Sequence, residues 1–449
     1  MFDVAILGGG ISGLYLAYHL LKTRNTDKNV TLGHPPRRIL LMEKSKLMGG
    51  RIHTYKDSHM SVEAGAGRIH TSHHRFLGLI RELGFGNLLV KIDNDSRFVR
   101  EDESGVKSLV DSPYRSITSS LIREAKKRPK HELIQKTLFD FAVEVCGKEQ
   151  ATLALDSFGY TTEFLVMNAY DAVELMKIVA LHSDYYVLAG GLSQVVEALV
   201  ERIKSLGGII VQGYTVDAIR YRRAALSNGP YTIFCSGGLR GGGSSGSGSS
   251  GREYSARQCI VTFTAKAVES IRFLGDADFK DRAVNWKRTL KASVYGGSLC
   301  RIYSQFDRAW FAEFGKLTID NDLRMVIPID AKTGIVMIAY SDGAVANKWS
   351  KLEETAGIRE VNRRLKSLVE DGLGIQITGG PKHTKLFHWS DAVGYWRVGA
   401  DSARVERMAV DGFCGMHFAG ENYSRLNQQW VEGSLDTADL VLDRILRVI

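Results

Sequence analysis

A glycine-rich turn close to the N-terminus constrains this chain more than any other feature of its sequence. The apolar run Phe2–Leu7 leads into Gly8–Gly13, which reads Gly-Gly-Gly-Ile-Ser-Gly, and Leu14–Lys22 has the pattern of a helix. In a Gly-x-Gly-x-x-Gly turn the first glycine allows the tight turn, the second a close approach to phosphate, and the third the packing of helix on strand. This order of strand, turn and helix predicts the first unit of a dinucleotide-binding fold.

The predicted turn also supplies an anion site. The N–H groups at the start of a helix have no partner within it, and the helix dipole favours negative charge there. A bare Gly-x-Gly-x-x-Gly is weak evidence, but its place after a strand and before a helix is the expected context. The residues predicted to hold a pyrophosphate are Gly8, Gly10, Ser12 and Gly13.

Two further elements belong to the same predicted site. A second apolar run, Ile39–Met42, ends at Glu43, whose carboxylate can accept hydrogen bonds from a ribose. Glu43 lies farther beyond the glycine turn than the usual ~20 residues, because the polar insertion Thr23–Arg38 precedes it. An ordinary exposed acid is the less favoured interpretation. Gly50 and Arg51 follow in a Gly-Gly-Arg turn, from which an arginine can reach a phosphate, as flavoproteins often require.

Composition narrows the class of protein. The 449 residues are enough for two or three domains, and 44% hydrophobic with 24% charged residues is typical of a soluble globular chain. No apolar run approaches a membrane span and no secretory signal is seen, so a cytoplasmic protein without a membrane anchor is expected. Five scattered cysteines without a CxxC pair argue against disulfides and zinc. The net charge of +9 favours anions, and no basic–aromatic cluster indicates nucleic acid.

The predicted fold class is α/β. A Rossmann-like domain is expected from three segments, residues 1–75, 185–275 and 400–449. A mixed α+β substrate domain is expected from a mainly helical part, 76–184, and a strand-rich part, 276–399. Residues 236–251 are Gly or Ser except Leu239 and Arg240, which predicts a flexible loop at a hairpin tip. The sequence leaves a monomer and a homodimer open.

Taken together, these motifs resemble the flavin amine oxidase family, which includes monoamine, polyamine and L-amino-acid oxidases. The resemblance spans nearly the whole length, except the central helical stretch and the Gly/Ser loop. The matching pieces are Gly8–Gly13, Glu43, Gly49–Arg51, Glu63–Ile69, Gly190–Ser193, Val216–Ile219, Ile260–Thr262, Phe418–Glu421 and Trp430–Ser434.

The resemblance implies bound FAD and a role for each matched segment. Ala66, Gly67 and Arg68 should pass beside the isoalloxazine ring, and the backbone of Val216 should contact the adenine. The remaining implied contacts are Gly420 and Glu421 at the pyrophosphate and ribityl region, and Trp430 with Val431 near the pyrimidine end. Tyr395 stands where monoamine oxidases carry a flavin-linked cysteine, which implies non-covalent FAD.

The resemblance also implies the chemistry, in which a C–N bond is oxidised, the imine is hydrolysed, and oxygen yields hydrogen peroxide. Two aromatic side chains usually flank the amine over the flavin. Trp430 fills one of these positions, and Trp396 is the better match for the other, with Tyr395 second. Such a pair guides a neutral amine and tolerates its charge by cation–π attraction. Simple core packing is the alternative interpretation.

Two arginines decide between substrate classes. Arg68 stands where amino-acid oxidases bind the substrate carboxylate, which favours an L-amino acid over the alternative, a polyamine or monoamine. Arg301 replaces a lysine that most of the family holds near the flavin, unless the alignment has slipped and Lys291 is that lysine. Arginine cannot act as a base. An FAD-binding protein without oxidase activity therefore stays open.

A group of three histidines, His70, His73 and His74, has the composition of a metal site. No companion cysteine or acid pattern supports zinc. Solvated or substrate-adjacent histidines are the favoured interpretation, and no metal is expected.

Overall fold

The structure is a computed structural model that describes residues 1–26, 38–92, 95–101, 105, 107–181, 184–223, 229–237 and 251–448. Most of the predicted Gly/Ser loop and most of the polar insertion before Arg38 lie outside the described residues.

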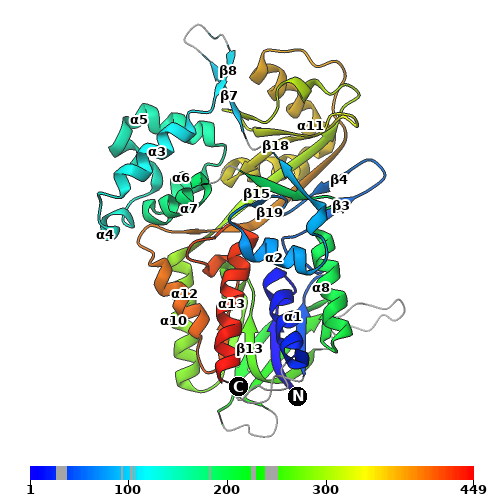
Figure 1. Ribbon diagram of the computed structural model, residues 1–449, viewed down its shortest axis with the longest axis vertical. Coiled ribbons are helices and arrows are strands. Elements are labelled where there is room, and N and C mark those ends of the chain that lie inside the picture. The colour runs from blue at the N-terminus through cyan, green and yellow to red at the C-terminus, as the bar shows by residue number, and fades with distance from the viewer. Residues whose placement is uncertain are drawn as a thin grey trace.

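The lower half of the molecule in Figure 1 is built on an eight-stranded sheet. Its strand order is β10-β2-β1-β13-β12-β11-β14, and β20 also pairs with β13. Strands β1, β2, β10, β13 and β20 run parallel, whereas β12 is antiparallel to both of its neighbours. The strands are β1 (Phe2–Leu7), β2 (Ile39–Glu43), β10 (Ile209–Gln212), β11 (Tyr214–Tyr221), β12 (Tyr231–Gly237), β13 (Arg252–Val261), β14 (Arg272–Leu274) and β20 (Met416–Phe418).

Helices cover both faces of this sheet, which explains why the last four residues of β1, Val4–Leu7, are all apolar and buried. Val4 and Ile6 pack into a core with α1 (Ile11–Thr26), α2 (His74–Glu82), α8 (Ser193–Ser205) and α13 (Val431–Val448). Ala5 and Leu7 face the opposite core, which includes α9 (Ala265–Ser270), α10 (Ala277–Ser293) and α12 (Ser402–Asp411).

A seven-stranded sheet forms the second unit, with order β19-β15-β18-β17-β16-β7-β8. Its long helix α11 (Gly343–Leu373) packs on β15, β18 and β19 and is interrupted at Gly357. The strands are β7 (Arg97–Glu101), β8 (Lys107–Asp111), β15 (Val294–Gln305), β16 (Leu317–Ile319), β17 (Arg324–Asp330), β18 (Ile335–Asp342) and β19 (Lys382–Trp396).

Five helices lie beside this second sheet (Figure 1). The sequence predicts one helix over Glu132–Cys146, but the structure has two, because Thr137 begins a new helix. The Thr137 side chain accepts from the Asp140 N–H at 3.0 Å, and the Thr137 N–H donates to the Asp140 carboxylate at 3.2 Å, which is a capping box. The helices are α3 (Tyr114–Ala125), α4 (Lys130–Leu133), α5 (Leu138–Phe158), α6 (Thr162–Val166) and α7 (Ala169–Leu181).

Two small sheets join the units. The three-stranded one has the order β5-β9-β6, and the other pairs β3 with β4. These strands are β3 (Thr54–Lys56), β4 (Ser61–Glu63), β5 (Ile69–His70), β6 (Leu89–Ile92) and β9 (Tyr185–Leu188).

The topology confirms the predicted α/β class, with a Rossmann-like sheet drawn from segments far apart in the chain. The strands between residues 89 and 111 were not expected, since that region reads as mainly helical. Across the described part of the chain, no helix has both the length and the apolar character required to cross a membrane.

Candidate functional site at the junction of the two units

The glycine turn has the geometry that its sequence predicts. Gly8 has φ of +117°, and a Cβ added to Gly13 would lie 2.0 Å from the Gly8 carbonyl oxygen, so α1 approaches the turn as closely as possible. A Cβ added to Gly10 would meet nothing within 4 Å. The open space next to the N-terminus of α1 therefore lies at the second glycine, where a phosphate is expected. Ser12 donates to the Ser434 carbonyl at 3.2 Å.

Glu43 is fixed against this turn. One carboxylate oxygen accepts from the Gly9 N–H and the other from the Ser45 N–H, both at 2.8 Å. Each oxygen keeps a second lone pair for a ligand hydroxyl. Gly50 approaches the same turn, because a Cβ on it would lie 3.2 Å from the Gly10 Cα.

Arg51 and Glu421 form an ion pair between two segments that the sequence placed separately at the cofactor. Arg51 also donates to the Ala392 carbonyl at 2.7 Å. The Glu421 carboxylate is buried and accepts from the Gln429 N–H at 3.0 Å and the Gly394 N–H at 3.3 Å. Glu421 thus ties the Gly-Glu turn to the segments that carry Tyr395 and Trp430.

Val216 and Ala66 were expected to contact the cofactor, and the structure shows how their backbones are held. The pairing of β11 with β12 is irregular between Val216 and Ala218, so the backbone there departs from the regular ladder. The Ala66 N–H donates to the Arg51 carbonyl at 2.9 Å, which holds the Gly65–Arg68 stretch beside the Gly-Gly-Arg turn.

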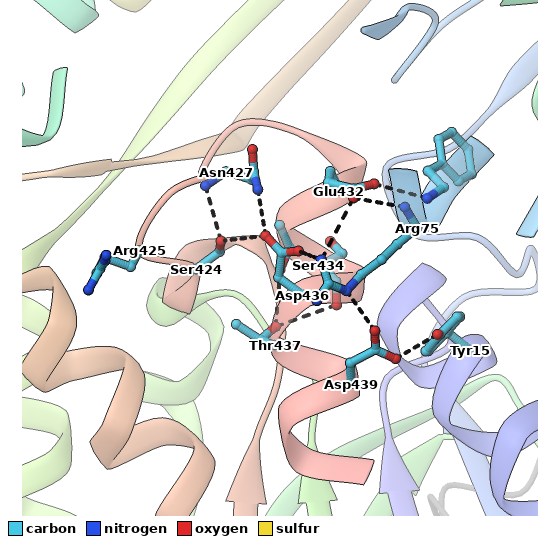
Figure 2. A network of polar contacts seen from close by, with 12 residues as sticks. Tyr15, Arg75, Ser424, Arg425, Asn427, Glu432, Ser434, Asp436, Thr437 and Asp439 are labelled. Atoms are coloured by element: carbon cyan, nitrogen blue, oxygen red, sulfur yellow. Dashed lines mark hydrogen bonds and ion pairs between the residues drawn. The ribbon is translucent and has the colours of Figure 1, made fainter. Parts of the chain in front are cut away.

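Hydrogen bonds and ion pairs connect the start of α13 to the start of α2, as Figure 2 shows. The Glu432 carboxylate accepts from the N–H groups of Arg75 and Phe76, both at 2.9 Å, so it caps α2 from another helix. Arg75 in turn donates to Asp436 at 2.8 Å and to Asp439 at 2.6 Å. This network sets the position of Val431 and Trp430, which immediately precede Glu432.

Trp430 packs against the histidine segment. Its ring lies edge-on to His73 with centroids 4.9 Å apart, and 6.2 Å from Tyr185. Burial, with smaller effects from His70 and His74, lowers the pKa of His73 to about 3. His73 is therefore neutral, and its Nδ1 accepts from the His70 N–H at 3.1 Å. Within the described ranges, no three His, Cys, Asp or Glu side chains could hold a metal ion together.

Arg68 points into a cluster of tyrosines. Its Nη2 donates to the Tyr160 hydroxyl at 3.3 Å, and its guanidinium lies 5.6 Å from the centre of the Tyr185 ring. Tyr160 and Tyr340 are edge-on, with centroids 5.3 Å apart.

Arg301 contacts Tyr340 and the segment before Arg68. It donates from Nη1 to the Glu63 carbonyl at 2.9 Å and from Nη2 to the Tyr340 hydroxyl at 3.2 Å. A Cβ on Gly67 would lie 3.4 Å from Arg301 Nη1, so this arginine is directly beside the Gly65–Arg68 stretch. Burial raises the pKa of Tyr340, but the two guanidiniums outweigh it and the net pKa is lowered. Lys291, the sequence alternative, is exposed on α10.

Tyr395 and Trp396 face opposite ways, as neighbours in a strand do. Trp396 is fully buried in a hydrophobic core, and its indole N–H has no partner among the described residues. Burial raises the pKa of Tyr395, and the next causes are Asp342, Glu163, Tyr160 and Tyr340. Tyr395, the second choice from the sequence, is therefore the residue whose phenol meets the tyrosine cluster.

Glu163 on α6 is the residue that sequence reasoning missed. Only 5% of it is exposed, and burial, with the neighbouring Asp342, raises its pKa to about 8. A hydrogen bond from Gln429 acts in the opposite direction. Tyr114, Tyr185 and Tyr395 all respond to its charge. The only sequence signal is a single acid in the apolar stretch that follows two threonines.

The fold is α/β, and its glycine turn and Gly-Gly-Arg turn lie beside the Gly65–Arg68 stretch, next to a cluster of arginines and aromatic residues. The family model "Flavin containing amine oxidoreductase" matches residues 11–446. The chain belongs to that family.

Individual relatives are distant. The flavin-dependent L-tryptophan oxidase RebO of Lentzea aerocolonigenes is 24% identical over 490 residues, which cover 97% of this chain and 96% of that protein. Flavin-containing amine oxidase A of Equus caballus is 33% identical over 94 residues, 21% of this chain, and the match spans only 16% of that protein's length. A putrescine oxidase redesigned in its cofactor binding has a TM-score of 0.74 at 14% identity, over 99% of both chains, which shows the same fold.

Proposed function

We propose that this protein oxidises an L-amino acid to the imino acid with non-covalently bound FAD, and that oxygen is reduced to hydrogen peroxide. The observation that supports the substrate class is the position of Arg68. Its guanidinium lies among tyrosine hydroxyls, next to the Gly65–Arg68 stretch that the resemblance puts at the flavin. The relative that matches along its whole length is named a tryptophan oxidase, which agrees with an amino-acid substrate.

The residues of the first sheet fit FAD. Gly10 leaves open space at the N-terminus of α1, Glu43 keeps free lone pairs at the end of β2, and Arg51 brings a cation to the same turn. When bound, FAD accepts the two electrons released as the C–N bond is oxidised. The segment Gly394–Trp396 contains no cysteine, so this chain offers no thiol for a covalent bond at that place.

Arg68 would bind the substrate carboxylate through its two-pronged guanidinium, a geometry that suits a carboxylate. The phenol of Tyr340 accepts from Arg301 at 3.2 Å, and the charges of Arg301 and Arg68 both lower its pKa. A phenol polarised in this way is a stronger hydrogen-bond donor to an anion. The carboxylate would therefore be held at the positive end of the cluster.

Trp430 and Tyr395 would position the amine. Trp430 is anchored by the Glu432 network and Tyr395 by its place in β19. Aromatic faces accept a neutral amine by apolar contact and a cation by electrostatic attraction. Arg301 stays protonated at every working pH and takes no proton from the substrate. Its role would be a fixed positive charge beside the Gly65–Arg68 stretch.

Two other functions are each favoured by one observation. The buried acid Glu163 is the kind of residue that an amine or polyamine oxidase would need. Arg301 donates to the Glu63 carbonyl and the Tyr340 hydroxyl and stands where most of the family has a lysine. This replacement favours an FAD-binding protein without oxidase activity. We rank both below amino-acid oxidation, because neither explains the placement of Arg68.

The proposal is tested with substrates that differ only in the carboxylate. L-Norleucine and pentylamine share the same chain, and anaerobic bleaching of the flavin reports oxidation without involving oxygen. A hydrogen-bonded ion pair is worth about 1.5–3 kcal/mol, so Arg68→Met should lower kcat/KM for L-amino acids by about 10- to 100-fold. Pentylamine oxidation should change by less than about threefold. A wild-type preference for the amine, or an unaffected KM for amino acids in Arg68→Met, would disprove the assignment.

A further inference from the structure

Glu163 is a buried acid that the proposed chemistry does not use. It lies on α6, is 5% exposed, and is bordered by the tyrosine cluster that also contains Arg68. Its nearest charged neighbour is another acid, Asp342, and its hydrogen-bonding neighbour is the neutral amide of Gln429. A carboxyl group in such surroundings is costly unless it stays protonated or gains a cation.

Asp342 stabilises the start of α6 by hydrogen bonds, whereas Glu163 caps no described helix. The Asp342 carboxylate accepts from the Thr161 N–H at 2.8 Å, the Thr161 hydroxyl at 3.0 Å and the Thr162 N–H at 2.7 Å. It therefore caps the start of α6. Glu163 caps no helix among the elements described and joins none of the described ion pairs, so a packing role explains its placement poorly.

Glu163 and Arg68 belong to one site by geometry. Tyr160, three residues before Glu163, accepts from Arg68 at 3.3 Å, and Asp342, two residues after Tyr340, accepts from the Thr162 N–H next to Glu163 at 2.7 Å. The Tyr185 ring lies under the Arg68 guanidinium, and the same phenol responds to the Glu163 charge. Tyr395 responds to Glu163 and to Tyr160, and Tyr160 accepts from Arg68. The site therefore has a cationic part at Arg68 and Arg301 and a part with two acids, Glu163 and Asp342, and aromatic side chains line both.

A ligand that matches this pattern carries a carboxylate and, beyond a short apolar stretch, a cation. We propose that Glu163 binds the side-chain cation of the substrate, which makes basic L-amino acids such as lysine, ornithine and arginine the substrate class. This inference rests on the proposed function, because it takes the α-carboxylate to be at Arg68. An entering ammonium or guanidinium group ionises Glu163 and pairs with it, whereas an apolar side chain leaves the acid without a partner.

The first test uses ligands that cannot react. 6-Aminohexanoate has the carboxylate and terminal ammonium of lysine but no α-amine, and hexanoate lacks the ammonium too. Their dissociation constants follow from the perturbation of the flavin spectrum of the holoenzyme. We expect 6-aminohexanoate to bind about 10- to 100-fold more tightly than hexanoate. In Glu163→Gln this difference should disappear, with hexanoate affinity unchanged.

The second test uses L-lysine and L-norleucine, which differ only in the terminal amine. In the wild type, anaerobic flavin reduction should favour lysine by about tenfold or more in kcat/KM, and Glu163→Gln should lose most of that preference. Glu406→Gln, at a half-buried acid that accepts from the Arg425 N–H at 2.8 Å, is the matched control. Glu163→Asp keeps the carboxylate and should keep a preference for lysine, so it serves if the Gln variant folds poorly.

Each other outcome overturns a defined part of the account. An unchanged lysine preference in Glu163→Gln would refute the role of Glu163 and leave amino-acid oxidation standing. An equal loss of rate on lysine and norleucine would refute it too, because Glu163 would then act on the α-amine common to both. Failure of every L-amino acid to reduce the wild-type flavin would refute the proposed function itself.

Discussion

Replacing Glu163 by glutamine should remove a pH dependence from the folding stability of this protein. Burial, with the adjacent Asp342, raises the pKa of Glu163 to about 8 from an ordinary value of 4.5. Between these values the folded chain keeps the proton that the unfolded chain has released. The contribution of the protonated acid is therefore complete below the unfolded pKa and is lost as the pH rises through the folded one.

The magnitude follows from this proton difference. One proton retained by the folded state lowers the free energy of unfolding by about 1.4 kcal/mol per pH unit. From about pH 5.5 to about pH 7.5 the wild type should lose about 3 kcal/mol relative to Glu163→Gln, which has no proton to release. For a chain of 449 residues this corresponds to a Tm difference of about 3 °C.

Urea unfolding of both proteins at the two pH values measures the effect. The other buried groups that titrate in this range, including Asp171 and Glu432, are present in both proteins and cancel in the difference. A stability gap that stays constant with pH would refute the reasoning. Such a constant difference would mean that Glu163 is ionised in the folded and the unfolded chain alike at both pH values.

Three further predictions concern the glycine turn, the α2 cap and the aromatic pair. Gly13→Ala forces a Cβ to within 2.0 Å of the Gly8 carbonyl oxygen and should prevent folding. Gly10→Ala meets no clash and should leave the apoprotein stable. It should weaken FAD binding by about tenfold or more, measured by flavin fluorescence. Glu432→Gln weakens the cap on α2 and should destabilise the protein by about 1–2 kcal/mol in urea unfolding. Tyr395→Leu and Trp396→Phe each shrink a buried side chain and should each lower stability by about 1–3 kcal/mol, but only Tyr395→Leu should also slow flavin reduction.

The dinucleotide half of the fold could be predicted because its signals are local. The glycine turn works through backbone geometry within six residues, and the structure reproduces the close contact of Gly13 with Gly8. Glu43 ends a strand that apolar periodicity identifies. A local signal can still mislead about where a strand ends. The strand-like run Ile209–Ile219 predicts one strand, but Gly213, with φ of +81°, divides it into β10 and β11.

The substrate side could be predicted only in part, because its contacts connect distant segments. Sequence resemblance directed attention to Arg68 and Arg301, and the structure shows both beside Tyr340. No local pattern in the sequence shows that Glu163 lies near Tyr395. The two residues are 232 positions apart, and the packing of α6 on β19 brings their segments together. The choice between Tyr395 and Trp396 likewise depends on contacts made across the fold, because both are buried and the pKa of Tyr395 responds to Tyr160, Tyr340 and Glu163.

The measurement that tests the central claim most directly is a survey of anaerobic flavin bleaching and peroxide release with the wild-type holoenzyme. The substrates are the twenty L-amino acids together with putrescine, spermidine and spermine. The account predicts reduction by L-amino acids, led by those with basic side chains, and little by the amines. Reduction by the polyamines alone, or by no substrate while FAD is plainly bound, would contradict it.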